Sequence, residues 1–254
     1  MSNINVFDEC VVQSLHNLRD FLEFDLLPIY NSNNIYTASI VGNLGLDITK
    51  HRYIMYIHQD VQFLPGSGEQ IAKLINSMDE TRILTGAVGI SIKYDDTNID
   101  EWGFCVENNK VGVVLNEHDE VVWDGVEDIS IVHSLDEICI IVDKFSGIRF
   151  DNSIHGFHLY GLDICLQARA AGYEIAAGAI NMKHYGKYSS SIYRDHNFIQ
   201  KLVKLHKKWL MNIQSIYAPY AHWSNNRIVS YVPYALKDQY DSRIDVSRIA
   251  VTVI

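Results

Sequence analysis

The sequence predicts an α/β protein in which helices flank a mostly parallel sheet. Between residues 4 and 92, segments with the apolar pattern of strands alternate with amphipathic segments of helical period, which is the signature of this class. The chain has 254 residues, of which 48% are hydrophobic and 20% charged, and this composition is typical of a globular protein with one large domain.

The elements expected in the first half follow from this alternation. In the helix expected over residues 8–24, apolar side chains recur at helical spacing, and Asp8 and Glu9 suit the positive end of a helix dipole. The other elements expected here are strands over 4–7, 25–31, 53–57 and 83–92, and helices over 40–52 and 68–80.

The second half is expected to begin with a hairpin or irregular insertion at about 95–130, where short apolar pieces alternate with Asp, Asn and Gly. A helix over 160–172 is expected to end at Gly172, and a strand over 174–185 and an amphipathic helix over 198–210 follow. Residues after about 214 are aromatic and irregular. We therefore divide the chain into a domain over 1–213 and a C-terminal extension over 214–254.

Charge and cysteine usage restrict the class of protein. The formal charge of −10 disfavours a nucleic-acid partner, because such partners are usually bound by basic surfaces. The four cysteines are far apart and form no CxxC pair, which favours a reducing compartment. The first residues lack the pattern of a signal peptide, and no apolar run approaches the ~20 residues of a membrane helix. We expect a soluble, cytoplasmic protein without a transmembrane segment.

Polar residues follow the buried strand expected over 53–57. His58 and Asp60 stand at its carboxyl end, which is where open α/β sheets collect their ligands. A carboxylate and an imidazole together suit Mn²⁺ or Mg²⁺ shared with a phosphate. The alternative is structural, with Asp60 capping the next helix and His58 half-buried in the fold.

A second polar cluster lies just before the helix expected over 160–172. It contains His155, His158, Tyr160 and Asp163, and a histidine or aspartate here could take the proton of a substrate hydroxyl. Alternatively, Asp163 satisfies the first-turn amides of the helix. His184 follows a strand, and a single histidine in such a place is more often structural than a ligand.

The order and spacing of these motifs resemble the GT-A glycosyltransferases, in particular a divergent branch of the large inverting family two. The resemblance rests on the HQD triplet at 58–60 and on GFHLYGLDICLQARAAGY at 156–173, and covers roughly residues 4–205, with 95–130 matching poorly. It implies the GT-A fold, the Rossmann-like fold of nucleotide-diphospho-sugar transferases.

In that family an Asp-X-Asp motif at a strand end binds a divalent metal and the donor diphosphate. The resemblance implies that Asp60 is a metal ligand, that His58 replaces the first aspartate, and that His184 is a further metal ligand or a phosphate contact. The family's base lies in a Glu-Asp-X-Asp-Leu block, of which this chain keeps only Asp163. Asp163 or His158 would then act as the catalytic base.

The resemblance also implies residues around the donor. The expected donor or nucleotide contacts are Asp8, Asn31, Asn43, Gln59, Asp136 and Glu137. For Asp136 and Glu137, a solvated turn before a strand is an equally good interpretation. Lys201, Lys204, Lys207 and Lys208 could add positive potential near a diphosphate, although the solvated face of an amphipathic helix is the simpler interpretation.

The function implied is a metal-dependent inverting transfer of a sugar from a nucleotide-diphosphate donor, with a UDP-sugar favoured, to a hydroxyl acceptor in glycan or polysaccharide synthesis. The alternative is a GT-A-like domain that binds a nucleotide-sugar or glycan without catalysis. A metal-dependent phosphoester hydrolase would need more carboxylates than this chain offers at its strand ends. Self-association into a homo-oligomer, or assembly through the aromatic C-terminal residues, stays open.

Overall fold

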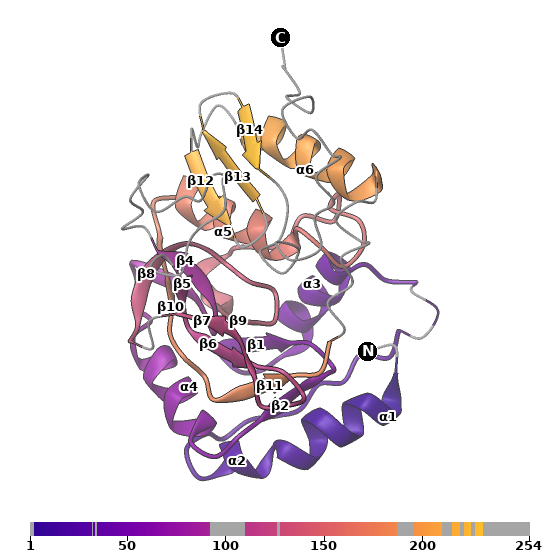
Figure 1. The fold of residues 1–254 in the computed structure, drawn as a ribbon, viewed down its shortest axis with the longest axis vertical. Helices are drawn as coiled ribbons and strands as arrows, with labels where there is room; N and C mark the ends of the chain where they lie inside the picture. Colours follow the sequence, from indigo (N-terminus) through magenta and orange to yellow (C-terminus); the bar gives the residue numbers. More distant parts are fainter. Residues whose placement is uncertain are drawn as a thin grey trace.

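A computed structural model describes residues 3–31, 33, 35–91, 110–125, 128–186 and 196–209. It also describes the backbone of three C-terminal strands, β12 (Ser215–Ala218), β13 (Ala221–Ser224) and β14 (Arg227–Ser230) (Figure 1).

The main sheet has seven strands and a mixed direction. In spatial order they are β1 (Tyr53–Ile57), β9 (Cys139–Asp143), β3 (Arg82–Gly86), β10 (Glu174–Ala177), β8 (Ser130–Leu135), β4 (Gly89–Ser91) and β5 (Lys110–Val111). Strand β9 lies between β1 and β3 and is antiparallel to both, whereas β3 and β10 are parallel. The α/β class is confirmed, but the mostly parallel sheet is corrected to a mixed one, because β8 and β9 return between strands that run the other way.

A second, four-stranded sheet carries the turn after β1. Its order is β2 (Val61–Phe63), β11 (Met182–His184), β6 (Val113–Leu115) and β7 (Val121–Asp124). The antiparallel pair β6 and β7 is the hairpin expected in the middle of the chain, while residues 92–109 lie outside the described part. The single strand expected over 83–92 is divided into β3 and β4, and the one expected over 174–185 is divided into β10 and β11. Strands β10 and β11 belong to different sheets.

Of the four long helices in the described part of the chain, the first three pack against the main sheet and the last packs on the third. They are α3 (Ala38–Ile48), α4 (Ser67–Asn76), α5 (Tyr160–Ala170) and α6 (His196–Trp209), with a short 3₁₀ turn η4 (Lys144–Ser146) after β9. The Thr37 side chain caps α3 by accepting a hydrogen bond from Ile40 N at 3.3 Å. Helix α5 ends just before Gly172, whose φ of 88° is the left-handed conformation that ends many helices.

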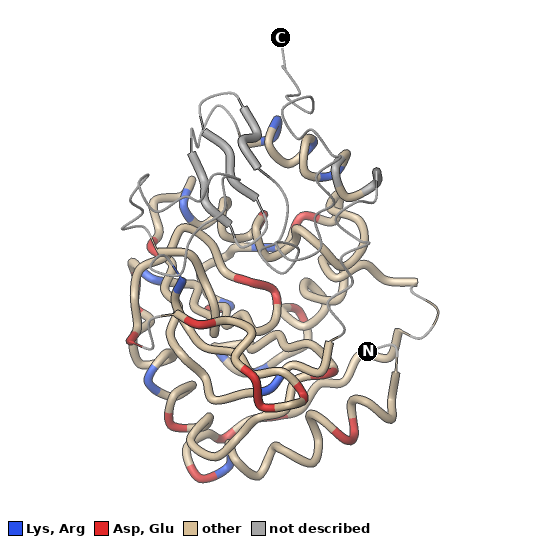
Figure 2. The backbone as a smooth tube through the Cα atoms, in the orientation of Figure 1, with Lys and Arg blue, Asp and Glu red and all other residues tan. Residues whose placement is uncertain are grey.

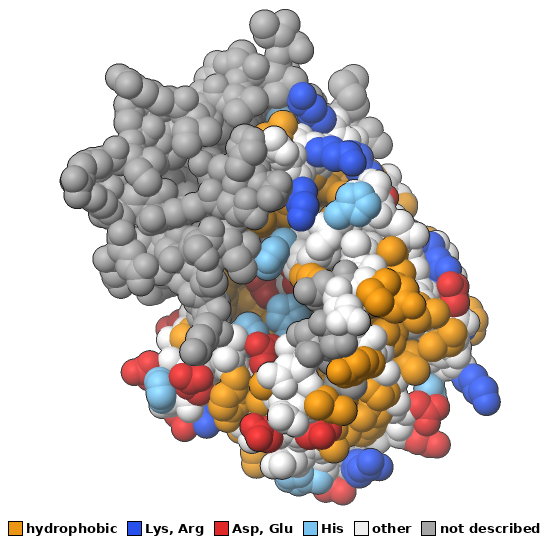
Figure 3. All heavy atoms as spheres, turned by 90° about the vertical axis from the view of Figure 1, so that its right-hand side faces the viewer, with side chains coloured by type: hydrophobic (Ala, Val, Ile, Leu, Met, Phe, Trp, Pro, Cys, Tyr) orange, Lys and Arg blue, Asp and Glu red, His pale blue; other side chains and the backbone are white. Residues whose placement is uncertain are grey.

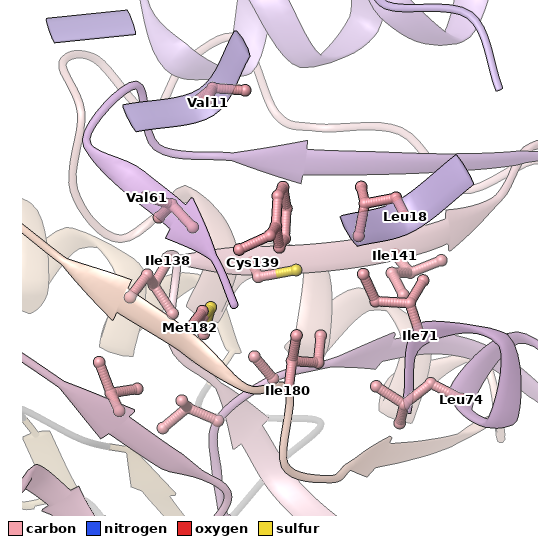
Figure 4. Close-up of a cluster of buried hydrophobic side chains, with 14 of the residues drawn as sticks. Val11, Leu18, Val61, Ile71, Leu74, Ile138, Cys139, Ile141, Ile180 and Met182 are labelled. Atoms are coloured by element: carbon pink, nitrogen blue, oxygen red, sulfur yellow. The ribbon is translucent and has the colours of Figure 1, made fainter. Parts of the chain in front are cut away.

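Strand β9 forms the centre of two apolar cores, one on each side of the sheet. All five of its residues are buried. Because side chains alternate across a strand, Cys139 and Ile141 pack on one side with Ile71 of α4 (Figure 4). Ile140 packs on the other side with Ile164 of α5. This burial on both sides fixes β9 beside β1, whose end carries the HQD triplet.

The N-terminal prediction is wrong in two places. Residues expected as a strand over 4–7 form helix α1 (Ile4–Phe7), which continues into the π-helical turn η1 (Asp8–Val12) and then α2 (His16–Arg19). The β-branched residues favoured a strand, but Asn3 Oδ1 accepts hydrogen bonds from Asn5 N and Val6 N and so starts a helix. Residues 25–31 have no regular structure.

The prediction that the C-terminal residues are irregular is wrong for the backbone of three segments within residues 215–230. Strands β12, β13 and β14 form an antiparallel sheet where an irregular extension was expected. The aromatic side chains of this region lie outside the described residues, and the division at residue 213 stays a prediction. Among the helices that the structure describes, none combines the length and apolar character needed to cross a bilayer.

Candidate metal centre

The turn between β1 and β2 is held from three sides. His58 N donates to Ile138 O at 3.2 Å, and Val61 N donates to His58 O at 3.4 Å. Tyr185 N donates to Asp60 O at 2.9 Å, and the pairing of β2 with β11 sets His184 opposite Val61. The register therefore brings His184 next to Asp60, although the two are far apart in sequence.

His58, Asp60 and His184 form a three-residue cluster, here called the triad. One ligand atom from each lies within 4.8 Å of the others, and all three side chains are half-buried. His184 Nε2 lies 3.3 Å from Asp60 Oδ1 and 3.4 Å from His58 Nδ1. Figure 3 shows histidine and acidic side chains lying together near the middle of one face. The arrangement offers two nitrogen donors and a carboxylate to one ion.

The electrostatics of the triad favour a cation. Burial, together with the nearby His184, lowers the pKa of His58, although Asp60 and Asp136 act against this change. Burial acts to raise the pKa of Asp60, but the hydrogen bond from His184 and the charge of both histidines bring it below its ordinary value. His58 is therefore neutral and Asp60 ionised near pH 7, which is the protonation that metal ligands need.

Gly186 packs directly against the His184 and Asp60 side chains of the triad. The sequence analysis did not identify this residue as part of the site. A Cβ added there would lie 2.7 Å from both Cε1 and Nε2 of His184 and 3.2 Å from Asp60 Oδ2. The signal was a glycine two residues after the histidine in KHYG, at a place where the backbone approaches side chains closely.

Replacing Gly186 with Ala is expected to turn the His184 ring away and weaken Mn²⁺ binding by about 10-fold, as loss of a supporting contact does at metal sites. Calorimetry with Mn²⁺ measures the affinity, and thermal unfolding without metal checks the fold. Gly172→Ala is the control, because nothing lies within 4 Å of its added Cβ, and the positive φ of Gly172, which Gly186 does not share, makes it the more demanding test of the backbone. Equal Mn²⁺ affinity in the two variants would contradict the close packing of Gly186 on the triad.

Residues 136–138 bridge the triad and the start of α5. Ile138 accepts the hydrogen bond from His58 N, while Glu137 Oε1 accepts one from Gly161 N at 3.0 Å. Asp136 is half-buried, and its Oδ1 accepts a hydrogen bond from Ile138 N at 3.0 Å. The charge of Asp136 acts on both His58 and His158. The bridge thus places the α5 start beside the metal ligands.

Glu137 is a buried anchor of α5, which excludes the solvated-turn interpretation for this residue. Its exposed fraction is 5%, and burial followed by the Asp136 charge raises its pKa well above the ordinary value. Backbone amides of residues 159–161 act in the opposite direction. A Cβ added to Gly161 would lie 2.6 Å from Glu137 Cγ, so the glycine lets the carboxyl group approach.

The two residues expected as base lie in different surroundings. His158 is half-buried, and its ring packs edge-on against Phe198 of α6 at 6.1 Å between centroids. Burial and then Lys201 lower the pKa of His158, while Asp136 acts to raise it. His155, in the same segment, is exposed.

Asp163 is 1% exposed and bonded on both oxygens. Its Oδ1 accepts hydrogen bonds from Lys208 Nζ and Trp209 Nε1, both at 2.7 Å, and its Oδ2 accepts one from Gln167 Nε2 at 2.9 Å. The residue therefore fastens the end of α6 to α5.

The other residues expected at the donor make local contacts. Asn31 exchanges hydrogen bonds with the backbone of Tyr36, and Asn43 does so with the backbone of Phe150. Gln59 Oε1 accepts a hydrogen bond from Asn3 N at 3.0 Å, and Asp8 is exposed on η1. These hydrogen bonds hold loops in place, and none of them joins Asn31 or Asn43 to the triad.

Comparison with known proteins gives distant similarities. No family model matches the chain. A protein of Fuscovulum blasticum named "ATP synthase subunits region ORF 6" is 22% identical over 166 residues, which are 63% of this chain and 61% of that protein. The chain thus matches about three fifths of the length of this curated relative. A crystal structure of GalNAc-T7 with UDP, GalNAc and Mn²⁺ is similar with a TM-score of 0.46 and 10% identity, over 70% of this chain and 36% of that one.

Proposed function

We propose that the chain is a metal-dependent glycosyltransferase of the GT-A fold, which moves a sugar from a nucleotide-diphosphate donor to an acceptor hydroxyl. One observation carries the proposal. The three residues that the sequence resemblance assigns to the metal come from two strand ends, and their ligand atoms lie within 4.8 Å of one another. A UDP-sugar is the donor we favour, on the resemblance alone.

The donor set favours Mn²⁺ over Mg²⁺. Two of the three ligands are imidazoles, and Mg²⁺ prefers oxygen ligands, whereas Mn²⁺ accepts nitrogen as well. His58, Asp60 and His184 would hold the ion and leave its remaining positions to phosphate oxygens and water. When bound there, the ion would neutralise the charge that builds up on the leaving diphosphate.

For the base we propose His158. Its lowered pKa leaves a neutral imidazole near pH 7, which can take the proton of an acceptor hydroxyl. The hydroxyl oxygen forms the bond to the anomeric carbon as the bond from that carbon to the diphosphate oxygen breaks. Attack from the opposite face inverts the configuration. The Asp136 charge favours the imidazolium that results. For Asp163, with both oxygens engaged, we propose a structural role.

A nucleotide panel tests this function. UDP, GDP, CDP and dTDP are titrated by calorimetry, each with and without Mn²⁺, on the wild-type protein and on Asp60→Ala. We expect one nucleotide to bind only with Mn²⁺ and Asp60→Ala to abolish that binding. At a hundredfold excess over its dissociation constant, the ligand should stabilise the fold by about 2.7 kcal/mol.

Sugar transfer or donor hydrolysis by the nucleotide-binding protein would separate catalysis from binding alone. Binding without turnover would favour the alternative function, a nucleotide-sugar binding domain. Absence of binding for every nucleotide, with and without Mn²⁺, would contradict both.

A further inference from the structure

Helix α6 places one lysine over the loop that leads into α5. We propose that Lys201 binds the diphosphate of the nucleotide, opposite the metal held by the triad. This inference rests on the proposed function and adds an anion site to it, because it names the group that holds the diphosphate from the side away from the ion.

The position of Lys201 is set by a glycine. Gly156 has a φ of 88°, and a Cβ added there would lie 3.0 Å from Lys201 Nζ. The loop is anchored, since Ala38 N at the start of α3 donates to Gly156 O at 3.0 Å. The ammonium group therefore lies close above the backbone, in space that a side chain at position 156 would fill.

Contacts connect Lys201 to the metal centre in a few steps. His158 packs on Phe198, which precedes Lys201 by one helical turn on α6, and the charge of Lys201 acts on His158. His158 and Asp136 in turn act on His58 of the triad. In addition, the 136–138 bridge accepts backbone hydrogen bonds from His58 on one side and Gly161 on the other. His158 is thus within electrostatic reach of both Lys201 and His58 of the triad.

The four lysines of α6 differ in their surroundings. Lys208 is paired with the carboxylates of Asp151 and Asp163, at 2.6 and 2.7 Å. Lys204 and Lys207 are exposed. Lys201 is half-buried, and among the described residues no carboxylate lies within ion-pair distance of it. Figure 2 shows Lys and Arg positions along α6 near the top of the view and most of the Asp and Glu positions farther down. A half-buried ammonium group without such a partner is suited to an anionic ligand.

Phosphate oxygens are the anionic groups that fit both ends of this site. A divalent ion at the triad would bind one phosphate, and the ammonium of Lys201 would bind the other as a point charge. With a net charge of −10, the protein repels anions in general, so local cations have to attract a diphosphate. The charge of Asp136, which also acts on His158, would repel a phosphate and has to be offset by these two positive groups.

The test compares Lys201→Met with Lys207→Met. Methionine keeps the apolar stem and removes the charge, and Lys207 is exposed on another face of the same helix. Calorimetry measures binding of Mn²⁺ alone, of inorganic pyrophosphate with Mn²⁺ and of UDP with Mn²⁺. We expect Lys201→Met to weaken pyrophosphate and UDP binding by about 10- to 100-fold, the loss typical of a charged hydrogen bond. Mn²⁺ affinity should stay unchanged, and Lys201→Arg should restore most of the loss.

The possible results separate this inference from the proposed function. If wild type binds UDP with Mn²⁺ and Lys201→Met binds it equally well, the anion site is wrong and the proposed function stands. The same holds if Lys207→Met loses as much affinity as Lys201→Met. If wild type binds neither pyrophosphate nor any nucleotide in the presence of Mn²⁺, both are overturned.

Discussion

Replacing Asp60 with Asn is expected to weaken Mn²⁺ binding by about 100-fold, since removing a residue that only supports a metal ligand already costs roughly 10- to 100-fold. Asp60 supplies the only negative charge of the triad, and the amide oxygen that replaces it is a weaker ligand. Calorimetric titration with Mn²⁺ at constant pH measures the change.

A second Asp–His pair provides the matched control. Asp25 Oδ2 lies 3.0 Å from His51 Nε2, the same pairing as in the triad, but this pair is largely exposed and has no third ligand among the described residues. Asp25→Asn should leave Mn²⁺ affinity unchanged. If Asp25→Asn and Asp60→Asn bind Mn²⁺ as tightly as wild type does, the ion binds elsewhere and the triad is structural.

Replacing Asp163 with Ala is expected to lower the free energy of unfolding by about 2–3 kcal/mol. The change removes the carboxylate that accepts the hydrogen bond from Trp209 Nε1 and that pairs with Lys208. Lys208 keeps its second ion pair, with Asp151. Helix α6 should then be held less firmly against α5. Urea unfolding measures the free energy, and hydrogen exchange at the end of α6 locates the effect.

Asp151→Ala is the control, because it removes the more exposed carboxylate from the same lysine and should cost at most about 1 kcal/mol. A stable Asp163→Ala protein that had lost sugar transfer would make Asp163 the base and reverse the assignment to His158. Equal destabilisation by both variants would show that the buried hydrogen bonds to Trp209 and Gln167 contribute little.

The elements that could be predicted from the sequence are those with a strong local pattern. The apolar run over 53–57, the helical period of α4 and the glycine after α5 each signal their element within a few residues. The hairpin in the middle was found for the same reason. The start of α1 was missed because the decisive contact, the Asn3 cap, competes with the strand preference of the residues that follow it.

The sheet order could not be predicted because it depends on contacts between distant segments. Strand β9 inserts between β1 and β3 because it is buried on both sides, and its pattern alone does not say which strands it pairs with. Long-range pairing of this kind has no local signal.

The candidate site was predicted only in part, because some of its residues have a local signal and others depend on contacts between distant segments. His58 and Asp60 lie at a strand end that is visible in the sequence, and the resemblance pointed to His184, which the β2–β11 register brings beside them. The surroundings of Asp163 and Glu137 depend on partners at distances of 45 and 24 residues, which no local pattern indicates.

Anomalous diffraction from crystals soaked in Mn²⁺ tests most directly whether the triad binds a metal. The predicted result is one strong anomalous peak within coordination distance of a nitrogen of His58, a nitrogen of His184 and a carboxylate oxygen of Asp60. The peak should disappear in crystals of Asp60→Asn. A triad that keeps its arrangement but shows no peak at a Mn²⁺ concentration that saturates the protein in solution would contradict a metal centre there, and with it the transferase built on that centre.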